Sequence, residues 1–259
     1  MMPIDARENF VFVLVSPKSS GNVGAAARAL MNMGFAALRL VAPRGYDPPA
    51  AARRAVHAAG IVERARCFDR LSDALADRTL TIGTTARTGT YRGEARELRA
   101  TAPEIATLAV NNRVAIVFGP EDYGLANREI AQCQWLLTIP SAPAYPSLNL
   151  AHAVAIVAYE LALALDGAPR PVGCDEEFAP AATVEAMHQR MERALIAIGF
   201  LPEANPGHIM HTLRAMLGRG GLRPREVEIL NGVARQIAWV AGDGAATLAA
   251  KRRDGRKLR

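Results

Sequence analysis

FVFVLVSPKSSGNVGAAARALMNMGF, residues 10–35, is the stretch that decides the fold. Its first part, Phe10–Ser16, is a short run of apolar and β-branched residues and predicts a buried strand. Pro17–Gly24 is rich in serine, glycine and asparagine and predicts a loop. The alanine-rich run Val23–Met33 predicts a helix, with Asn22 as its N-cap. A buried strand that leads through a polar loop into a helix is the opening unit of a parallel α/β sheet.

The same alternation of strands and helices continues outward from this stretch to residue 165. Further strands are predicted at Leu38–Val41, Ala65–Phe68, Thr79–Thr84, Val114–Phe118 and Trp135–Ile139. Helices are predicted at Pro49–Ala59, Asp69–Leu75, Thr101–Ala109, from Asn127, and at Leu148–Leu165. Thr101 with Glu104 has the spacing of a capping box, and Ser147 can cap the last helix. Residues 1–165 are therefore predicted to form an α/β domain with a mostly parallel sheet, covered by helices on both faces.

The pattern changes beyond residue 165. Residues 166–180 contain glycine, proline and acidic residues and are predicted to be a linker. The pattern then becomes purely helical, with helices predicted at about Thr183–Ile198, Pro206–Leu217 and Pro224–Val240. We therefore expect a small all-helical extension over residues 181–243 and a basic tail over residues 244–259.

Composition narrows the classes of protein that fit. Half of the 259 residues are hydrophobic and 22% are charged, as in soluble globular proteins. No apolar run reaches the roughly 18 to 20 residues that cross a bilayer, and the polar start does not fit a signal peptide. The three cysteines lie far apart, and the five histidines make no zinc pattern. We therefore expect a cytoplasmic protein that is not bound to a membrane and holds no metal.

The distribution of charge is more informative than the net charge of +6. Residues 1–165 carry 17 basic and 14 acidic groups, and residues 166–249 carry 8 and 10. The last ten residues, 250–259, carry 6 basic groups and 1 acidic group, so most of the excess lies there. Such a tail attracts phosphates, but short basic tails also occur on proteins that bind no nucleic acid. Charge alone leaves the partner open.

Four polar loops follow predicted strands, at Pro17–Gly24, Thr84–Tyr91, Gly119–Leu125 and Pro140–Ser147. Ligands of open α/β sheets bind at the carboxyl ends of the strands, so these loops predict a site for a small or nucleotide-like ligand. The alternative is that their glycines and prolines only turn the chain. The dinucleotide fingerprint, the P-loop and the serine nucleophile elbow are all absent from the sequence.

Four segments have a distinctive order. They are SGNVGAAARALMNMGF at residues 20–35, GTTAR at 83–87, FGPEDYGLANRE at 118–129 and IPSAPAYPSLNLAHAVAIVAYE at 139–160. Together they resemble the signature regions of the SpoU/TrmH class of the SPOUT methyltransferases, over about residues 10–165. Residues 200–237 resemble the C-terminal extension of the tRNA enzymes that methylate the ribose 2′-oxygen at position 32 of the anticodon loop. The resemblance implies an S-adenosylmethionine-dependent RNA 2′-O-methyltransferase that acts on tRNA.

The resemblance also implies structural features that the pattern of residues does not. It implies a C-terminal trefoil knot in the α/β domain, and a homodimer with the active site at the interface. The positions that match the cofactor site are Thr84, Ala86, Gly119, Gly124, Ile139, Ser147 and Leu148. The positions that match the groups around the reacting ribose are Arg28, Glu121, Ser147 and Asn149, with Asn22 as a positioning residue. The helical extension and the tail would bind tRNA, and Arg214, Arg219 and Arg223 are candidate contacts.

Other interpretations stay open from the sequence alone. Arg28 could be an ordinary salt-bridged helix residue, Glu121 an acid at a helix start, and Asn149 a first-turn residue. The same fold could act on ribosomal RNA, and only the helical extension argues against that substrate. The chain could also be an RNA-binding protein without catalytic activity, or an unrelated α/β enzyme that uses a nucleotide.

Overall fold

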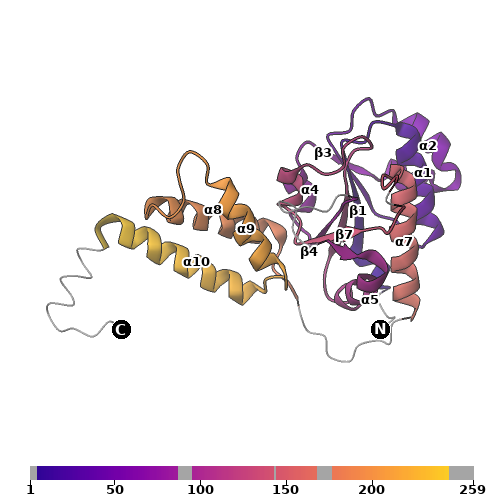
Figure 1. Cartoon of the computed structure of the whole chain (residues 1–259). Helices are drawn as coiled ribbons and strands as arrows, with labels where there is room; N and C mark the ends of the chain where they lie inside the picture. Colours follow the sequence, from indigo (N-terminus) through magenta and orange to yellow (C-terminus); the bar gives the residue numbers. More distant parts are fainter. Residues whose placement is uncertain (1–4, 87–94, 143, 168–176, 245–259) are drawn as a thin grey trace. The chain divides into compact units, whose positions relative to one another are not determined.

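The computed structural model describes residues 5–86, 95–142, 144–167 and 177–244 (Figure 1). The chain forms two compact units, Met1–Ala182 and Thr183–Arg259. Part of the GTTAR segment, most of the predicted linker and the basic tail beyond Gly244 lie outside the described residues.

A seven-stranded sheet forms the middle layer of the first unit, in the order β3-β2-β1-β6-β4-β7-β5. Every described strand pairing is parallel, which confirms the predicted α/β class. The strands are β1 (Phe10–Val15), β2 (Leu38–Val41), β3 (Arg66–Phe68), β4 (Leu80–Thr84), β5 (Arg96–Glu97), β6 (Val114–Phe118) and β7 (Trp135–Thr138). Only β5 was not predicted, because two residues at a sheet edge carry no hydrophobic periodicity.

Helices cover both faces of the sheet (Figure 1). They are η1 (Ala6–Asn9), α1 (Ser20–Asn32), α2 (Pro48–Ala55), η2 (Val56–Ala58), α3 (Ala59–Glu63), α4 (Leu71–Leu75), α5 (Leu98–Leu108), α6 (Asn127–Ile130) and α7 (Leu150–Gly167). Phe10, Phe12 and Leu14 of β1 pack with α1, α2, α3, α5 and α7. The alternate residues of β1 pack on the other face with α4 and α6. Side chains that alternate between two buried faces explain why β1 is apolar at every position.

Several predicted helix starts are wrong by two or three residues. The hydroxyl of Ser19 caps α1 by accepting from the backbone N–H of Asn22 (3.3 Å), so Asn22 lies in the first turn. Helix α5 begins at Leu98, and the Thr101 hydroxyl donates to the Glu97 carbonyl (2.7 Å) instead of capping a helix. Several polar side chains near each start can accept from a free N–H, and the sequence does not show which one does.

The cap of α7 and the course of α2 also differ from prediction. The side-chain oxygen of Asn149 accepts from the Ala151 backbone N–H (2.9 Å), so Asn149 takes the capping role expected of Ser147. The predicted helix Pro49–Ala59 is interrupted at Val56, whose φ is 56°. This left-handed conformation is strained for a β-branched residue and ends the regular helix there.

Helix α7 is long and apolar enough to cross a membrane by length and composition alone. In the fold it packs on the sheet and contacts α1 and α5, with Val154, Val157 and Leu161 fully buried. Burial in a protein core accounts for its apolar character.

The first unit extends beyond the predicted boundary at residue 165. Phe178 and Ala179 are buried, and the Phe178 backbone N–H donates to the Asn112 side-chain oxygen (2.9 Å). The Ala181 N–H donates to the Arg78 carbonyl (2.7 Å). The end of the predicted linker is therefore part of the first unit.

The second unit contains α8 (Ala181–Ala197) from its third residue onward, α9 (Gly207–Gly218), α10 (Pro224–Trp239) and η3 (Val240–Gly244). The Arg214 guanidinium forms a two-pronged ion pair with Glu185, one contact being 3.0 Å, and its side chain is 16% exposed. This pairing joins α8 to α9 and argues against the predicted role of Arg214 in binding tRNA. Burial lowers the pKa of the neighbouring His188 to about 4, so this imidazole is neutral at pH 7.

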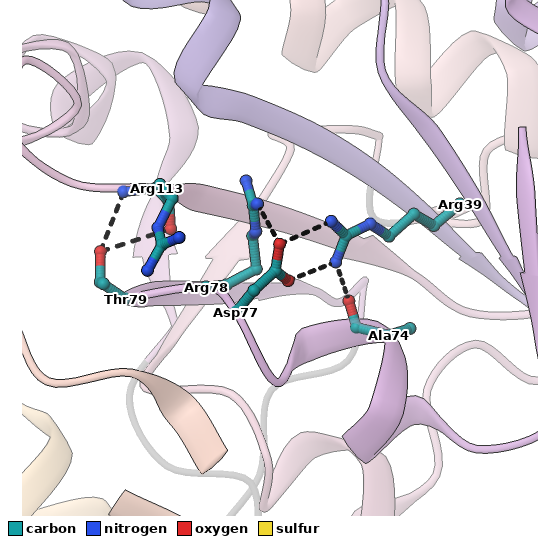
Figure 2. A network of polar contacts seen from close by, with 6 residues as sticks. All are labelled: Arg39, Ala74, Asp77, Arg78, Thr79 and Arg113. Atoms are coloured by element: carbon teal, nitrogen blue, oxygen red, sulfur yellow. Dashed lines mark hydrogen bonds and ion pairs between the residues drawn. The ribbon is translucent and has the colours of Figure 1, made fainter. Parts of the chain in front are cut away.

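A buried arginine ties β2 to the end of α4 (Figure 2). Arg39 donates to both carboxylate oxygens of Asp77 (2.6 and 2.8 Å) and to the Ala74 carbonyl (2.6 Å), and Arg78 also pairs with Asp77. The hydrogen bonds from Arg39 hold the pKa of the Asp77 carboxyl well below its usual range. A guanidinium can be buried here because its donors are satisfied by charged and carbonyl oxygens.

We expect Asp77→Asn to destabilise the protein by about 1–2 kcal/mol at pH 7. Removal of one partner leaves the buried Arg39 charge uncompensated, although the partial exposure of Asp77 reduces the loss. Because the folded pKa is depressed, this stabilisation is complete above the unfolded pKa of about 3.9. It declines as the pH falls below that value and is lost fully below the folded pKa. Urea unfolding at pH 7 and pH 3.5 checks this: the difference between variant and wild type should shrink at the lower pH.

Candidate active site

A cavity of about 300 Å³ lies where β4, β6 and β7 end. Its walls are the loops after these three strands, together with Leu150 and Ala153 of α7. The strands are neighbours in the sheet and parallel, so their carboxyl ends meet at one edge. Three of the four predicted ligand loops therefore form one site, whereas the loop after β1 does not line the cavity.

All seven residues predicted for the cofactor site line this cavity. They are Thr84, Ala86, Gly119, Gly124, Ile139, Ser147 and Leu148. Phe118, Leu125 and Leu137 provide apolar surface in the cavity wall. They lie beside the backbone groups of the loop Gly119–Gly124, which we call the glycine loop. An apolar slot with a few backbone donors and acceptors is a typical site for a small ligand with an aromatic ring.

Backbone geometry explains the two glycines of the cavity. A Cβ atom on Gly119 would lie 2.2 Å from the Gly124 carbonyl carbon and the Leu125 nitrogen, so only glycine fits without a shift of backbone. Gly124 has a φ of +68°, and its N–H closes a tight turn onto the Pro120 carbonyl (3.0 Å). Thr84 is also held in the cavity wall, because its hydroxyl donates a hydrogen bond to the Val117 carbonyl of the neighbouring strand (3.0 Å).

A chain of polar side chains joins the cavity to α1. Glu121 lines the cavity and accepts from the Asn22 side-chain amide (2.8 Å). The Asn149 amide in turn donates to the Asn22 oxygen (3.2 Å). Three residues predicted to surround the reacting ribose are thus brought together from α1, the loop after β6 and the start of α7. Asn22 is the bridge between the other two.

Arg28 stands apart from this chain. It lies on α1, is exposed, and does not line the cavity. Within the described parts of the chain, Arg28 has no hydrogen bond or ion pair, so the salt-bridged alternative finds no support there. Its guanidinium is available to a ligand that approaches α1 from outside.

Two charged residues of the site were not singled out from the sequence. The Lys18 ammonium lies 2.6 Å from an Asp122 carboxylate oxygen, and its backbone N–H donates to Glu121 (3.2 Å). The hydrogen bond from Lys18 lowers the pKa of the Asp122 carboxyl. Two features of the sequence point to these residues as part of the site. Lys18 follows β1, and Asp122 is adjacent to Glu121.

Other chemistries find little support in the described residues. No group of three or more histidine, cysteine or acidic side chains there could hold a metal ion. Burial raises the pKa of the Cys133 thiol to about 12, so this cysteine stays protonated and is a poor nucleophile.

Comparison with known families divides the chain as the structure does. The model of the SpoU rRNA Methylase family matches residues 9–159. The model of the tRNA methyltransferase TrmJ, C-terminal domain, matches residues 182–251.

Individual relatives match over most of the chain. The tRNA (cytidine/uridine/adenosine-2′-O-)-methyltransferase TrmJ of Pseudomonas aeruginosa is 38% identical over 242 residues, covering 88% of this chain and 93% of the relative. The crystal structure of TrmJ from Z. mobilis superposes with a TM-score of 0.76 at 33% identity, covering 88% of this chain and 98% of that one. A structure described as giving insights into the 2-OH methylation of C/U34 on tRNA is 29% identical, with a TM-score of 0.50 over 61% of this chain and 97% of its own. The chain therefore belongs to the SpoU methylase family.

Proposed function

We propose that this protein transfers the methyl group of S-adenosylmethionine to a ribose 2′-hydroxyl of tRNA, at position 32 of the anticodon loop. One observation carries the proposal. A cavity lined by all seven predicted cofactor residues borders a polar chain of Glu121, Asn22 and Asn149. This site occurs in a chain whose second part matches the C-terminal domain of a tRNA methyltransferase.

The cavity fits the proposed methyl donor. Its volume of about 300 Å³ is at the lower end of the range for small-molecule sites, roughly 300–1,000 Å³. Leu125, Leu137 and Ile139 provide apolar surface for an adenine ring, and the loop Gly119–Gly124 offers backbone groups for polar contacts. Bound there, S-adenosylmethionine would supply a methyl group already activated by its sulfonium.

The protein's part in the reaction is mainly positioning and charge stabilisation. The 2′-oxygen attacks the methyl carbon as the carbon–sulfur bond breaks, so held geometry accounts for much of the rate. Arginine stays charged at neutral pH, so Arg28 binds the adjacent phosphate and stabilises negative charge on the attacking oxygen. The hydroxyl proton passes to phosphate or water.

The carboxylate of Glu121 orients the polar chain. Its two oxygens accept from the Asn22 amide and the Lys18 N–H. Asn22 is thereby fixed in the orientation that receives the Asn149 amide. Asn149 is held at its other end as the cap of α7. Ser147, on the cavity wall two residues before Asn149, completes the group proposed around the ribose.

We extend the proposal to the family's assembly, a homodimer with the active site across the interface. The position of Arg28 supports it, since this residue is exposed and outside the cavity lining, where a second subunit could complete the site. The proposed trefoil knot involves the course of the chain between β4 and α7.

Position 34 of tRNA is the second candidate target. The structure associated with C/U34 methylation supports this alternative but covers only 61% of this chain. Position 32 is preferred because residues 200–237 resemble the extension of enzymes that modify that position, and the matching domain model covers residues 182–251.

A methylation assay tests the proposed function. Tritiated S-adenosylmethionine is incubated with the protein and with tRNA or ribosomal RNA from cells that lack it. The RNA is then digested, and its nucleosides are identified by mass spectrometry. A 2′-O-methylnucleoside at position 32 is the expected product. Label at position 34 supports the second candidate, label in ribosomal RNA alone overturns the tRNA assignment, and no label in any RNA contradicts the proposal.

Gly119→Ala is expected to weaken S-adenosylmethionine binding about 10- to 100-fold. The added methyl group meets backbone atoms of Gly124 and Leu125 that cannot rotate away, and overpacking of this kind costs roughly 1–3 kcal/mol. Isothermal titration calorimetry measures the change. Gly232→Ala is the matched control, because a Cβ there meets nothing within 4 Å. Equal binding by both variants would show that the glycine loop does not hold the donor.

A further inference from the structure

Lys18 is a positively charged side chain directly beside the polar chain of the site. Its ammonium lies 2.6 Å from Asp122, and its backbone N–H donates to Glu121. Both carboxylates line the cavity, and Glu121 holds Asn22. Lys18 therefore contacts Glu121 directly and lies next to the other groups proposed to surround the target ribose.

The ion pair with Asp122 is easily exchanged. The side chains of Lys18 and Asp122 are 45% and 47% exposed. Exposed pairs of this kind contribute little to stability and are screened by salt. The Lys18 ammonium can thus leave Asp122 for another anion at small cost.

Two carboxylates of the cavity disfavour the approach of RNA. Glu121 and Asp122 both line the cavity, and their field repels a phosphate that comes near it. A cation beside them offsets that repulsion. Lys18 is the only lysine in the first 250 residues of a chain that otherwise uses arginine. A lysine is a flexible point charge that can change partners without the fixed two-pronged geometry of a guanidinium.

We propose that Lys18 leaves Asp122 and binds a phosphate of the substrate RNA next to the target ribose. Asp122 holds Lys18 in place in the free protein and competes with that phosphate. This inference rests on the proposed function, because it assumes that RNA is the substrate at this cavity.

The test compares Lys18→Gln, Asp122→Asn and the double variant with wild type, and uses Lys18→Arg as the charge-conserving control. The KM for tRNA is measured across a range of salt concentrations, and the dissociation constant of S-adenosylmethionine is measured separately. Lys18→Gln should raise the KM for tRNA and reduce the slope of log KM against log salt by about 1. Lys18→Arg should keep most of that slope. Asp122→Asn should lower the KM, because the competing carboxylate is gone.

Three outcomes would overturn the inference. If Asp122→Asn restores both the wild-type KM and the wild-type salt slope to the Lys18→Gln variant, Lys18 only neutralises Asp122. If Lys18→Gln weakens cofactor binding and leaves the KM for tRNA unchanged, Lys18 serves the cofactor carboxylate. If Lys18→Gln changes neither quantity, it serves no ligand. A wild-type protein that methylates no tRNA counts instead against the proposed function, so the two failures are distinct.

Discussion

Arg28→Ala is expected to lower kcat with tRNA at least about a hundredfold and to leave S-adenosylmethionine binding unchanged. Loss of a donor that stabilises charge in a transition state costs roughly 100- to 1,000-fold in rate. Arg28 does not line the cavity, so its removal leaves the walls around the donor intact. It is exposed on α1, so its truncation creates no cavity in the core.

Single-turnover methylation at saturating tRNA separates this role from tRNA binding. Arg53→Ala is the matched control, since Arg53 is also an exposed arginine on a helix of the first unit. Arg28→Lys keeps the charge but loses the planar guanidinium with its paired donors, so its rate should lie between those of Arg28→Ala and the wild type. Normal turnover by Arg28→Ala would refute both charge stabilisation and proton abstraction by this residue.

The fold was predictable because it follows from local patterns. β1 and β6 are apolar runs between turn residues, and β2, β4 and β7 are largely apolar, as parallel strands buried on both faces generally are. Helix starts were less predictable, as at Asn22, Thr101 and Ser147, since the choice among neighbouring caps depends on the loop that leads in. β5 escaped prediction because its pairing with β7 comes from tertiary structure.

The site was predictable where residues follow strands and unpredictable where they pair across the fold. The cavity residues fall in three loops that the topology brings to one edge, and the resemblance supplied their roles. The Lys18–Asp122 and Arg39–Asp77 pairs join residues 104 and 38 positions apart. The hydrophobic periodicity of the sequence carries no information about such contacts. The same reason explains Arg214, which looked like an RNA contact but lies paired with Glu185.

A chain that ends at Ala182 is expected to bind S-adenosylmethionine normally and to bind tRNA about a hundredfold more weakly. The first unit ends at Ala182 and contains the whole cavity, so the donor site does not need the second unit. We propose that the second unit and the basic tail act as a linked second binding module, and such linkage can raise overall affinity by 100-fold or more. Filter binding with labelled tRNA, beside calorimetry with the donor, measures the two effects.

The position of the truncation affects the stability of the first unit. A chain that ends at residue 169 is therefore compared with the chain that ends at Ala182. It lacks Phe178, which is buried in the core, and leaves the Asn112 side chain without the Phe178 N–H. Loss of a buried phenylalanine costs roughly 3–5 kcal/mol, so this shorter chain should unfold at lower urea and bind the donor less well. If the chain ending at Ala182 binds tRNA as tightly as the full protein, the helical unit is not the tRNA-binding part. The affinity must then come from the first unit itself, which carries Lys18 and the exposed Arg28.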